Sequence, residues 1–163
     1  MKAIITVKGI GSMTAELYPE KAPETVKNFV ALAKDGFYEG LIFHRVISGF
    51  MIQGGGFDES FSPKRAKAIK GEFRSNGFTG NDIRHTRGVL SMARTSDPDS
   101  ASSQFFIMHA DAPHLDGAYA AFGRVTEGLE VIDAVASVKV GNYGYFSDVP
   151  VDPVVIESVK ITD

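Results

Sequence analysis

An arginine lies inside an apolar stretch of the sequence, in the run FHRVISGFMIQGG. Its β-branched and aromatic residues are typical of strands, and strand alternation places Arg45 on the same face as Phe43 and Ile47. A guanidinium is too costly to bury without a partner. Arg45 therefore either reaches solvent or a carboxylate, or stands as a fixed cationic donor at the edge of an apolar groove.

Two further stretches place amide side chains beside apolar ones. On the strand after the arginine, alternation puts Met51 and Gln53 on one face. In the run SQFFIMH, Gln104, Phe106 and Met108 point one way, and the residues between them point the other way into a core. An amide next to an aromatic ring suits a site that holds a peptide. The alternative is that the ring belongs to a second hydrophobic layer under a loop.

Several common catalytic chemistries lack the residues or the spacing that they need. The chain has no cysteine, which excludes a disulfide framework, a thiolate zinc site and a cysteine nucleophile. The histidines, His44, His85, His109 and His114, follow no metal-binding spacing, so neither a metal nor a cofactor is expected. The glycine run 54–56 opens no phosphate-binding motif, and the nucleophile-elbow pattern is absent. An acyl hydrolase is favoured only if a serine lies within hydrogen-bond reach of a histidine.

Length and composition predict one globular domain over residues 1–163. The chain is 44% hydrophobic and 23% charged, which excludes a disordered chain. Its net charge of −3 argues against nucleic-acid binding by phosphate neutralisation. No stretch approaches the ~18 apolar residues of a membrane span, and no export signal is visible. The expectation is a soluble, cytoplasmic protein without a membrane partner.

The hydrophobic pattern predicts eight short strands and two helices. Residues 2–18 are typical of a hairpin, a helix over 23–35 begins at a proline and ends at Asp35-Gly36, and a second helix covers 127–138. The six remaining β-type runs are LIFHRVI, FMIQGG, GVLSMA, QFFIMH, AAFGRV and VVIESVKI. Because no parallel crossover rhythm occurs, the pattern favours a mainly β fold, a closed or nearly closed antiparallel barrel with helices over its ends.

A long irregular stretch over about 55–88 interrupts this pattern, and loops of this length are usually functional or mobile. Residues 60–94 hold eight basic and two acidic side chains, whereas residues 95–163 hold three basic and eleven acidic ones. We interpret this polarity as a solvated basic loop opposite an acidic face; steering of an acidic partner is the alternative.

The runs FHRVISGFMIQGG, RGVLSMARTSDPDSASSQFFI and HLDGAYAAFGRVTEGLEVID together resemble the cyclophilin family of peptidyl-prolyl isomerases, and most of all its compact bacterial members. The resemblance covers nearly the whole chain, including KAPETVKNFVAL in the first predicted helix, and its motifs are long and ordered. It implies an eight-stranded antiparallel barrel closed by two helices, which agrees with the strand count obtained from the hydrophobic pattern.

By this resemblance the catalytic arginine of the family corresponds to Arg45, and its peptide-contacting glutamines correspond to Gln53 and Gln104. Other matched positions belong to the proline pocket, to the segment that pairs with the substrate backbone, and to the residue that closes the pocket. The proline pocket corresponds to Phe50, Met51, Phe106 and Leu115. The segment that pairs with the substrate backbone corresponds to Ala93 and Arg94, and the residue that closes the pocket corresponds to Phe122.

Two positions depart from the form typical of animal cytosolic cyclophilins. His114 stands where those proteins have a tryptophan, and Tyr119 stands where they have a histidine. Because that tryptophan donates a hydrogen bond to cyclosporin, the resemblance implies only weak binding of the drug. Tyr119 keeps a ring with a polar tip, so we expect catalysis to survive the second change.

The resemblance implies a monomeric enzyme that accelerates rotation about X-Pro bonds in peptides and in unfolded or folding proteins. Twisting the amide localises the lone pair on nitrogen, so a donor aimed at that nitrogen or at the moving carbonyl oxygen stabilises the twisted state. Arginine is always charged and presents five donors in a rigid fork. No proton moves and no covalent intermediate forms. The alternative is a non-catalytic proline-binding or chaperone module, which needs the apolar pocket but not Arg45.

Overall fold

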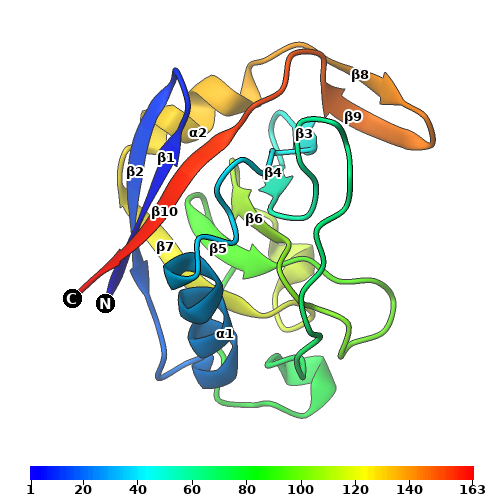
Figure 1. The fold of residues 1–163 in the computed structure, drawn as a ribbon. Helices are drawn as coiled ribbons and strands as arrows, with labels where there is room; N and C mark the ends of the chain where they lie inside the picture. Colours follow the sequence, from blue (N-terminus) through cyan, green and yellow to red (C-terminus); the bar gives the residue numbers. More distant parts are fainter.

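The computed structural model describes residues 1–163, and its main feature is an eight-stranded antiparallel sheet curled into a half-barrel (Figure 1). The strand order is β10-β1-β2-β7-β5-β6-β4-β3. These strands are β1 (Lys2–Val7), β2 (Gly11–Leu17), β3 (Arg45–Ile47), β4 (Met51–Gly54), β5 (Val89–Met92), β6 (Phe105–Met108), β7 (Ala121–Glu127) and β10 (Ile156–Thr162). The predicted mainly β class with two helices is therefore confirmed.

Full closure of the barrel, which the sequence pattern favoured, is overstated. No strand pairing joins β3 to β10, which lie at the two ends of the sheet order. Instead, the segments that precede these two strands meet: Phe43 N donates to Val154 O (2.9 Å) and Ile156 N donates to Leu41 O (2.7 Å). The two edges are thus joined by the segment before β3 and the start of β10 rather than by a strand ladder.

The first helix, α1 (Pro23–Lys34), matches the prediction over 23–35. It begins without a side-chain cap of its own, because Ala22 precedes it. The distant carboxylate of Glu72 serves instead: it accepts hydrogen bonds from Thr25 N and Thr25 Oγ1, both at 2.7 Å, and from Glu24 N at 3.2 Å. A carboxylate at a helix N-terminus satisfies unpaired N–H groups and stabilises the helix dipole.

The second helix, α2 (Leu129–Ala136), is shorter than the predicted 127–138. Its buried residues are Val131, Ile132, Val135 and Ala136. Neither helix is long and apolar enough to cross a membrane. Two short 3-10 helices complete the helical structure, η1 (Arg74–Asn76) within the predicted irregular stretch and η2 (Pro113–Leu115) after β6.

A second, two-stranded sheet was not predicted. It consists of β8 (Val140–Tyr143) and β9 (Phe146–Pro150), and it projects from the molecule beside β3 (Figure 1). The ring of Phe61 stacks on Tyr143 at 4.5 Å and lies 5.0 Å from Phe146. Contacts with a distant loop therefore hold this hairpin, and such contacts leave no period-2 pattern in the hairpin's own residues.

Two apolar clusters lie on opposite faces of the central strands. The inner cluster has 32 buried residues from the half-barrel and both helices. The outer cluster has seven, namely Met51, Val89, Phe106, Met108, Ala112, Leu115 and Ala121. Strand β6 divides as predicted: Phe105 and Ile107 belong to the inner cluster, whereas Phe106 and Met108 belong to the outer one. The sheet therefore has a second buried face, and the candidate site lies on it.

Candidate active site: an arginine at the rim of an apolar pocket

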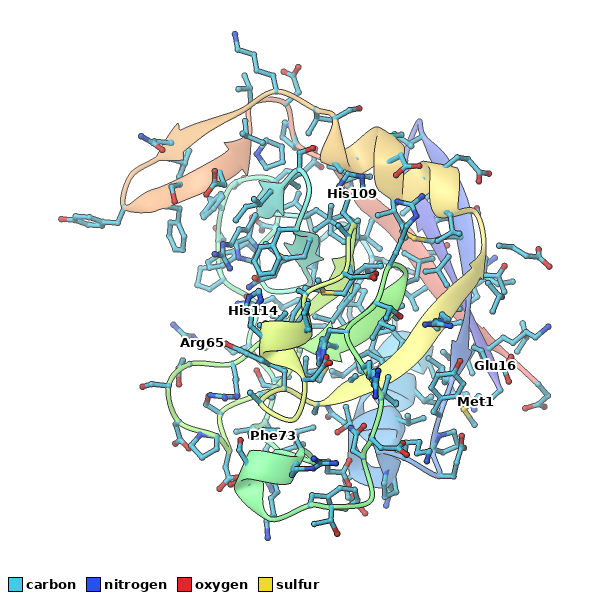
Figure 2. All side chains as sticks on the ribbon, turned by 180° about the vertical axis from the view of Figure 1, so that it is seen from behind. Met1, Glu16, Arg65, Phe73, His109 and His114 are labelled. Carbon is cyan, nitrogen blue, oxygen red and sulfur yellow. The ribbon has the colours of Figure 1, made fainter.

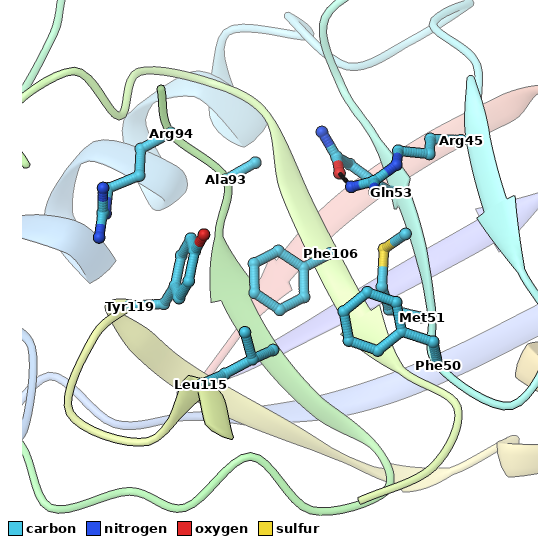
Figure 3. Close-up of a pocket in the computed structure, with 9 residues that line it drawn as sticks. All are labelled: Arg45, Phe50, Met51, Gln53, Ala93, Arg94, Phe106, Leu115 and Tyr119. Carbon is cyan, nitrogen blue, oxygen red and sulfur yellow. Dashed lines mark hydrogen bonds between the residues drawn. The ribbon is translucent and has the colours of Figure 1, made fainter. Parts of the chain in front are cut away.

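A pocket of about 120 Å³ opens over the outer cluster (Figure 3). Its floor and walls are mainly apolar, and two arginines stand at opposite sides of its mouth (Figure 3). The lining residues are Arg45, Phe50, Met51, Gln53, Ala93, Arg94, Phe106, Leu115 and Tyr119. All nine were expected at the site from the sequence.

Strand register brings the polar and apolar parts of the pocket together. Arg45 on β3 lies opposite Gln53 on β4, Gln53 lies opposite Phe106 on β6, and Phe106 lies opposite Ser91 on β5. Residues directly opposite each other in antiparallel strands share a face of the sheet. The four side chains therefore form one row across four strands, with the guanidinium at the edge and the phenyl ring at the centre.

The side chain of Arg45 is exposed at this edge and forms no ion pair. One guanidinium nitrogen donates to Gln53 Oε1 at 3.3 Å, and Gln53 Nε2 in turn donates to Gln104 Oε1 at 3.1 Å. This amide relay orients the arginine over the pocket and leaves most of its five N–H donors available. The guanidinium thus reaches solvent at the edge of the apolar pocket, without a carboxylate partner.

One detail of the alternation prediction is wrong. Phe43 does not share the face of Arg45, because its ring is fully buried in the inner cluster. Strand β3 begins only at Arg45, so the period-2 pattern does not extend back to residue 43. Ile47 does share the arginine's face and packs against the outer cluster.

Residues from η2 and the loop after it form the wall opposite β4. Leu115 is 8% exposed, and the ring of Tyr119 meets Phe106 edge-on at 5.8 Å. Arg94 is held between two rings, 4.9 Å from Phe73 and 4.6 Å from Tyr119, and it donates to Ala118 O at 2.7 Å. Cation–π contacts and a backbone acceptor thus fix Arg94 in place, whereas Arg45 keeps free donors.

Three predicted site residues lie outside the pocket lining. Gln104 borders a neighbouring cavity and contacts the pocket through Gln53. His114 is exposed on the rim, where its ring stacks on Phe50 at 5.9 Å. The prediction that Phe122 closes the pocket is corrected: its ring is fully buried in the inner cluster, 5.0 Å from Phe29. On β7 it is Ala121 that belongs to the outer cluster.

A hydrogen-bonded group beneath the pocket was not predicted from the sequence. His85 Nε2 lies 2.8 Å from Ser91 Oγ, its Nδ1 lies 3.2 Å from Asp116 Oδ1, and its ring stacks under Phe106 at 6.0 Å. Burial lowers the pKa of His85, although Asp116 partly opposes the shift. Ser91 therefore lies within hydrogen-bond reach of a histidine, which is the distance that a hydrolase would require. However, Ser91 and His85 are fully buried, so no substrate carbonyl reaches them. The group supports Phe106 from below.

No three His, Asp or Glu side chains come together in a way that would hold a metal ion. His44 is buried next to Arg45, and its imidazole packs edge-on against Phe57 at 4.8 Å. Burial, assisted by the charge of Arg45, lowers the pKa of His44 from 6.5 to about 4. This histidine is neutral near pH 7 and supplies no second charge beside the arginine.

The half-barrel sheet with two helices is the mainly β fold that the sequence resemblance implied, and comparison with known proteins agrees. Residues 2–161 match the family model for cyclophilin-type peptidyl-prolyl cis-trans isomerases. The chain therefore belongs to this family, and it is a peptidyl-prolyl cis-trans isomerase. The resemblance seen in the sequence is confirmed.

Individual relatives cover nearly the whole chain. A peptidyl-prolyl cis-trans isomerase of Acinetobacter baylyi is 48% identical over 158 residues, which are 93% of this chain and 81% of the relative. Peptidyl-prolyl cis-trans isomerase B of Escherichia coli is 42% identical over 162 residues, 94% of this chain and 95% of the relative. A cyclophilin-type isomerase of Cryptosporidium parvum, solved in the presence of the dipeptide Ala-Pro, superposes with a TM-score of 0.82 at 29% identity, covering 100% of this chain and 99% of that one.

Proposed function

We propose that the pocket holds the prolyl ring of the substrate while Arg45 stabilises the twisted X-Pro amide. The observation that carries this proposal is the exposed guanidinium at the pocket rim, oriented by Gln53 and free of any carboxylate. Phe106 and Leu115 provide apolar surface for the ring, and Met51 closes the floor beneath it. An Ala-Pro dipeptide was present with the Cryptosporidium relative, which supports a proline-containing peptide as the ligand here.

The chemistry follows from the electronic structure of the amide. Rotation about a peptide bond has a barrier of about 18–20 kcal/mol, because conjugation between nitrogen and carbonyl is lost on twisting. In the twisted state the nitrogen regains its lone pair, and a nearby N–H donor binds this state better than either planar isomer. Arg45 presents several such donors with a permanent charge. No proton is transferred and no bond to the protein forms.

The contribution of Arg45 to the rate can be calculated from a single hydrogen bond to the twisted amide. A charge-assisted hydrogen bond contributes about 1.5–3 kcal/mol. At about 1.4 kcal/mol per tenfold in rate, this corresponds to roughly one to two orders of magnitude. The remaining acceleration comes from holding the ring still while the carbonyl group swings, and from replacing water around that carbonyl with the apolar wall.

We further propose that the physiological substrates are unfolded or folding proteins with accessible X-Pro bonds. The pocket is small and open to solvent, so it accepts a single prolyl ring in an extended chain rather than a folded surface. Segment Ala93–Arg94 borders the pocket on the side away from Arg45, where it is available to the substrate backbone.

Substitution of the arginine tests the mechanism. We expect Arg45→Ala to lower kcat/KM on a short X-Pro peptide at least tenfold with unchanged circular dichroism, because the side chain is exposed. Arg45→Lys should restore little activity, since a point charge lacks the fork geometry. Arg84→Ala is the matched control, because Arg84 is exposed and does not line this pocket. Unchanged kcat/KM in a folded Arg45→Ala protein would refute the proposed role of Arg45.

A further inference from the structure

The turn between β3 and β4 presents Phe50 to the pocket, and several hydrogen bonds fix its position. Phe50 N donates to Ile47 O at 3.0 Å, which closes the turn, and Gly49 has a φ of 79°, as type II turns require at that position. Phe50 O accepts hydrogen bonds from His109 N at 2.9 Å and Ala110 N at 3.3 Å. The turn therefore lies against the end of β6, where residue 109 follows the strand.

The imidazole of His109 holds the other side of the same turn. Gly49 N donates to His109 Nδ1 at 2.8 Å, so Nδ1 is an acceptor and the ring proton is on Nε2. His109 Nε2 then donates to Asp133 Oδ1 on α2 at 3.0 Å. A single neutral tautomer satisfies both hydrogen bonds, and the ring links the turn to the helix.

Asp133 is itself fixed by an arginine. Arg87 donates to both carboxylate oxygens of Asp133, at 2.7 and 2.9 Å, and also to His109 O at 3.1 Å. The backbone of Arg87 donates to Asp111 Oδ1 at 2.9 Å. The guanidinium lowers the pKa of Asp133, so this carboxylate stays charged. A two-point arginine–carboxylate pair has a well-defined geometry, which makes it a firm anchor for the imidazole.

We propose that His109 is a positioning residue for the isomerase, which sets the Phe50 wall of the proline pocket through Gly49. The chain of contacts runs from Arg87 through Asp133 and His109 to the turn. The inference rests on the proposed function, because it assumes that Phe50 contacts the prolyl ring. His109 lies beside α2 (Figure 2) and does not line the pocket.

The expected kinetic effect follows from where Phe50 lies. Phe50 borders the apolar part of the pocket, so its contact with the prolyl ring is nearly the same in the planar and the twisted states. Interactions of this kind change KM and leave kcat unchanged. Loss of the Gly49 hydrogen bond therefore raises KM, by roughly 3- to 10-fold, with kcat within about twofold.

The test is a double-mutant cycle on a short X-Pro peptide. The protein and its variants His109→Ala, Phe50→Ala and the double substitution are compared by KM, kcat and melting temperature. If His109 acts through Phe50, the histidine substitution raises KM in the native background but by less than about twofold when Phe50 is already alanine. An unchanged KM in folded His109→Ala, or equal factors in both backgrounds, would overturn the proposal.

Two further variants separate positioning from general stability. In His109→Asn, the amide oxygen occupies about the position of Nδ1 and accepts from Gly49, so KM should return to within about twofold of the native value. Thr25→Ala is the matched control, because it removes one hydrogen bond, to Glu72, at the start of α1 and away from the pocket. It should lower the melting temperature without changing KM. A rise in KM in this control would show that KM follows stability, against the proposal. The Arg45→Ala variant tests the proposed mechanism through kcat, whereas the His109 variants test positioning through KM, so the two proposals can fail independently.

Discussion

Acid should lower the free energy of unfolding through His44, by an amount that follows from the burial of its imidazole. The imidazole is 4% exposed, its Nδ1 has no hydrogen-bond partner, and the rings of Phe57, Phe61 and Phe146 lie 4.8–6.4 Å away. Burial lowers its pKa from 6.5 to about 4. The folded protein thus resists protonation that the unfolded chain accepts.

The sign and the size follow from proton linkage. Above pH 6.5 both states are neutral at this position, and His44 adds no pH dependence. As the pH falls from 6.5 to about 4, only the unfolded chain gains the proton, so stability is lost throughout that interval and no further below it. A difference of about 2.5 pKa units corresponds to a loss of about 3 kcal/mol in the free energy of unfolding.

Urea unfolding at fixed pH values between 7.5 and 4 measures this effect. His44→Phe places a non-titrating ring among three phenylalanines, so its free energy of unfolding should fall about 3 kcal/mol less than that of the native protein over the interval. His85 also has a lowered pKa, but it is present in both proteins and cancels in the comparison. Parallel curves for the native protein and His44→Phe would refute the reasoning.

Three further predictions concern the cap, the chemistry and the rim. Glu72→Gln should lower the free energy of unfolding by about 1–3 kcal/mol in urea, because a neutral amide accepts less well from Thr25 and Glu24; unaltered stability would contradict its capping role. A chelator should leave kcat/KM unchanged, and kcat/KM should be flat from about pH 7 to 9, since arginine does not titrate there; a bell-shaped profile would indicate a histidine acid or base. His114→Trp should tighten cyclosporin inhibition at least tenfold, because an indole N–H adds a donor for the drug. It should change kcat/KM for a peptide by less than about threefold, because position 114 stacks on Phe50 at the rim and does not line the pocket. Tight inhibition of the native protein would show that position 114 does not control cyclosporin binding.

Local pattern predicted those parts of the molecule that neighbouring residues decide. The proline at position 23 and the Asp35-Gly36 pair after the helix predicted α1 to within one residue. The alternation in β6 correctly separated Phe105 and Ile107 from Phe106 and Met108. Backbone dihedrals and side-chain direction in these elements depend on residues one to four positions away, which a sequence displays directly.

The pocket itself depends on contacts between distant segments. Strand register places Arg45, Gln53 and Phe106 in one row, whereas Phe43, which precedes β3, is buried in the inner cluster. No local pattern distinguishes Phe122, which faces the inner cluster, from its neighbour Ala121, which faces the outer one. A tight turn joins β3 to β4, but β4 and β6 are far apart in the chain, so their register is set by burial of two apolar faces at once.

The sequence by itself thus indicated which residue types could form the site, whereas the tertiary structure decided which of these side chains lie next to one another. An arginine within an apolar strand and an amide beside an aromatic ring already indicated the kind of chemistry. The Glu72 cap on α1 and the His109 link to Gly49 join groups 47 and 60 residues apart. Such hydrogen bonds form only after the sheet has brought the segments together, because closing a long loop costs entropy that a single local contact does not repay.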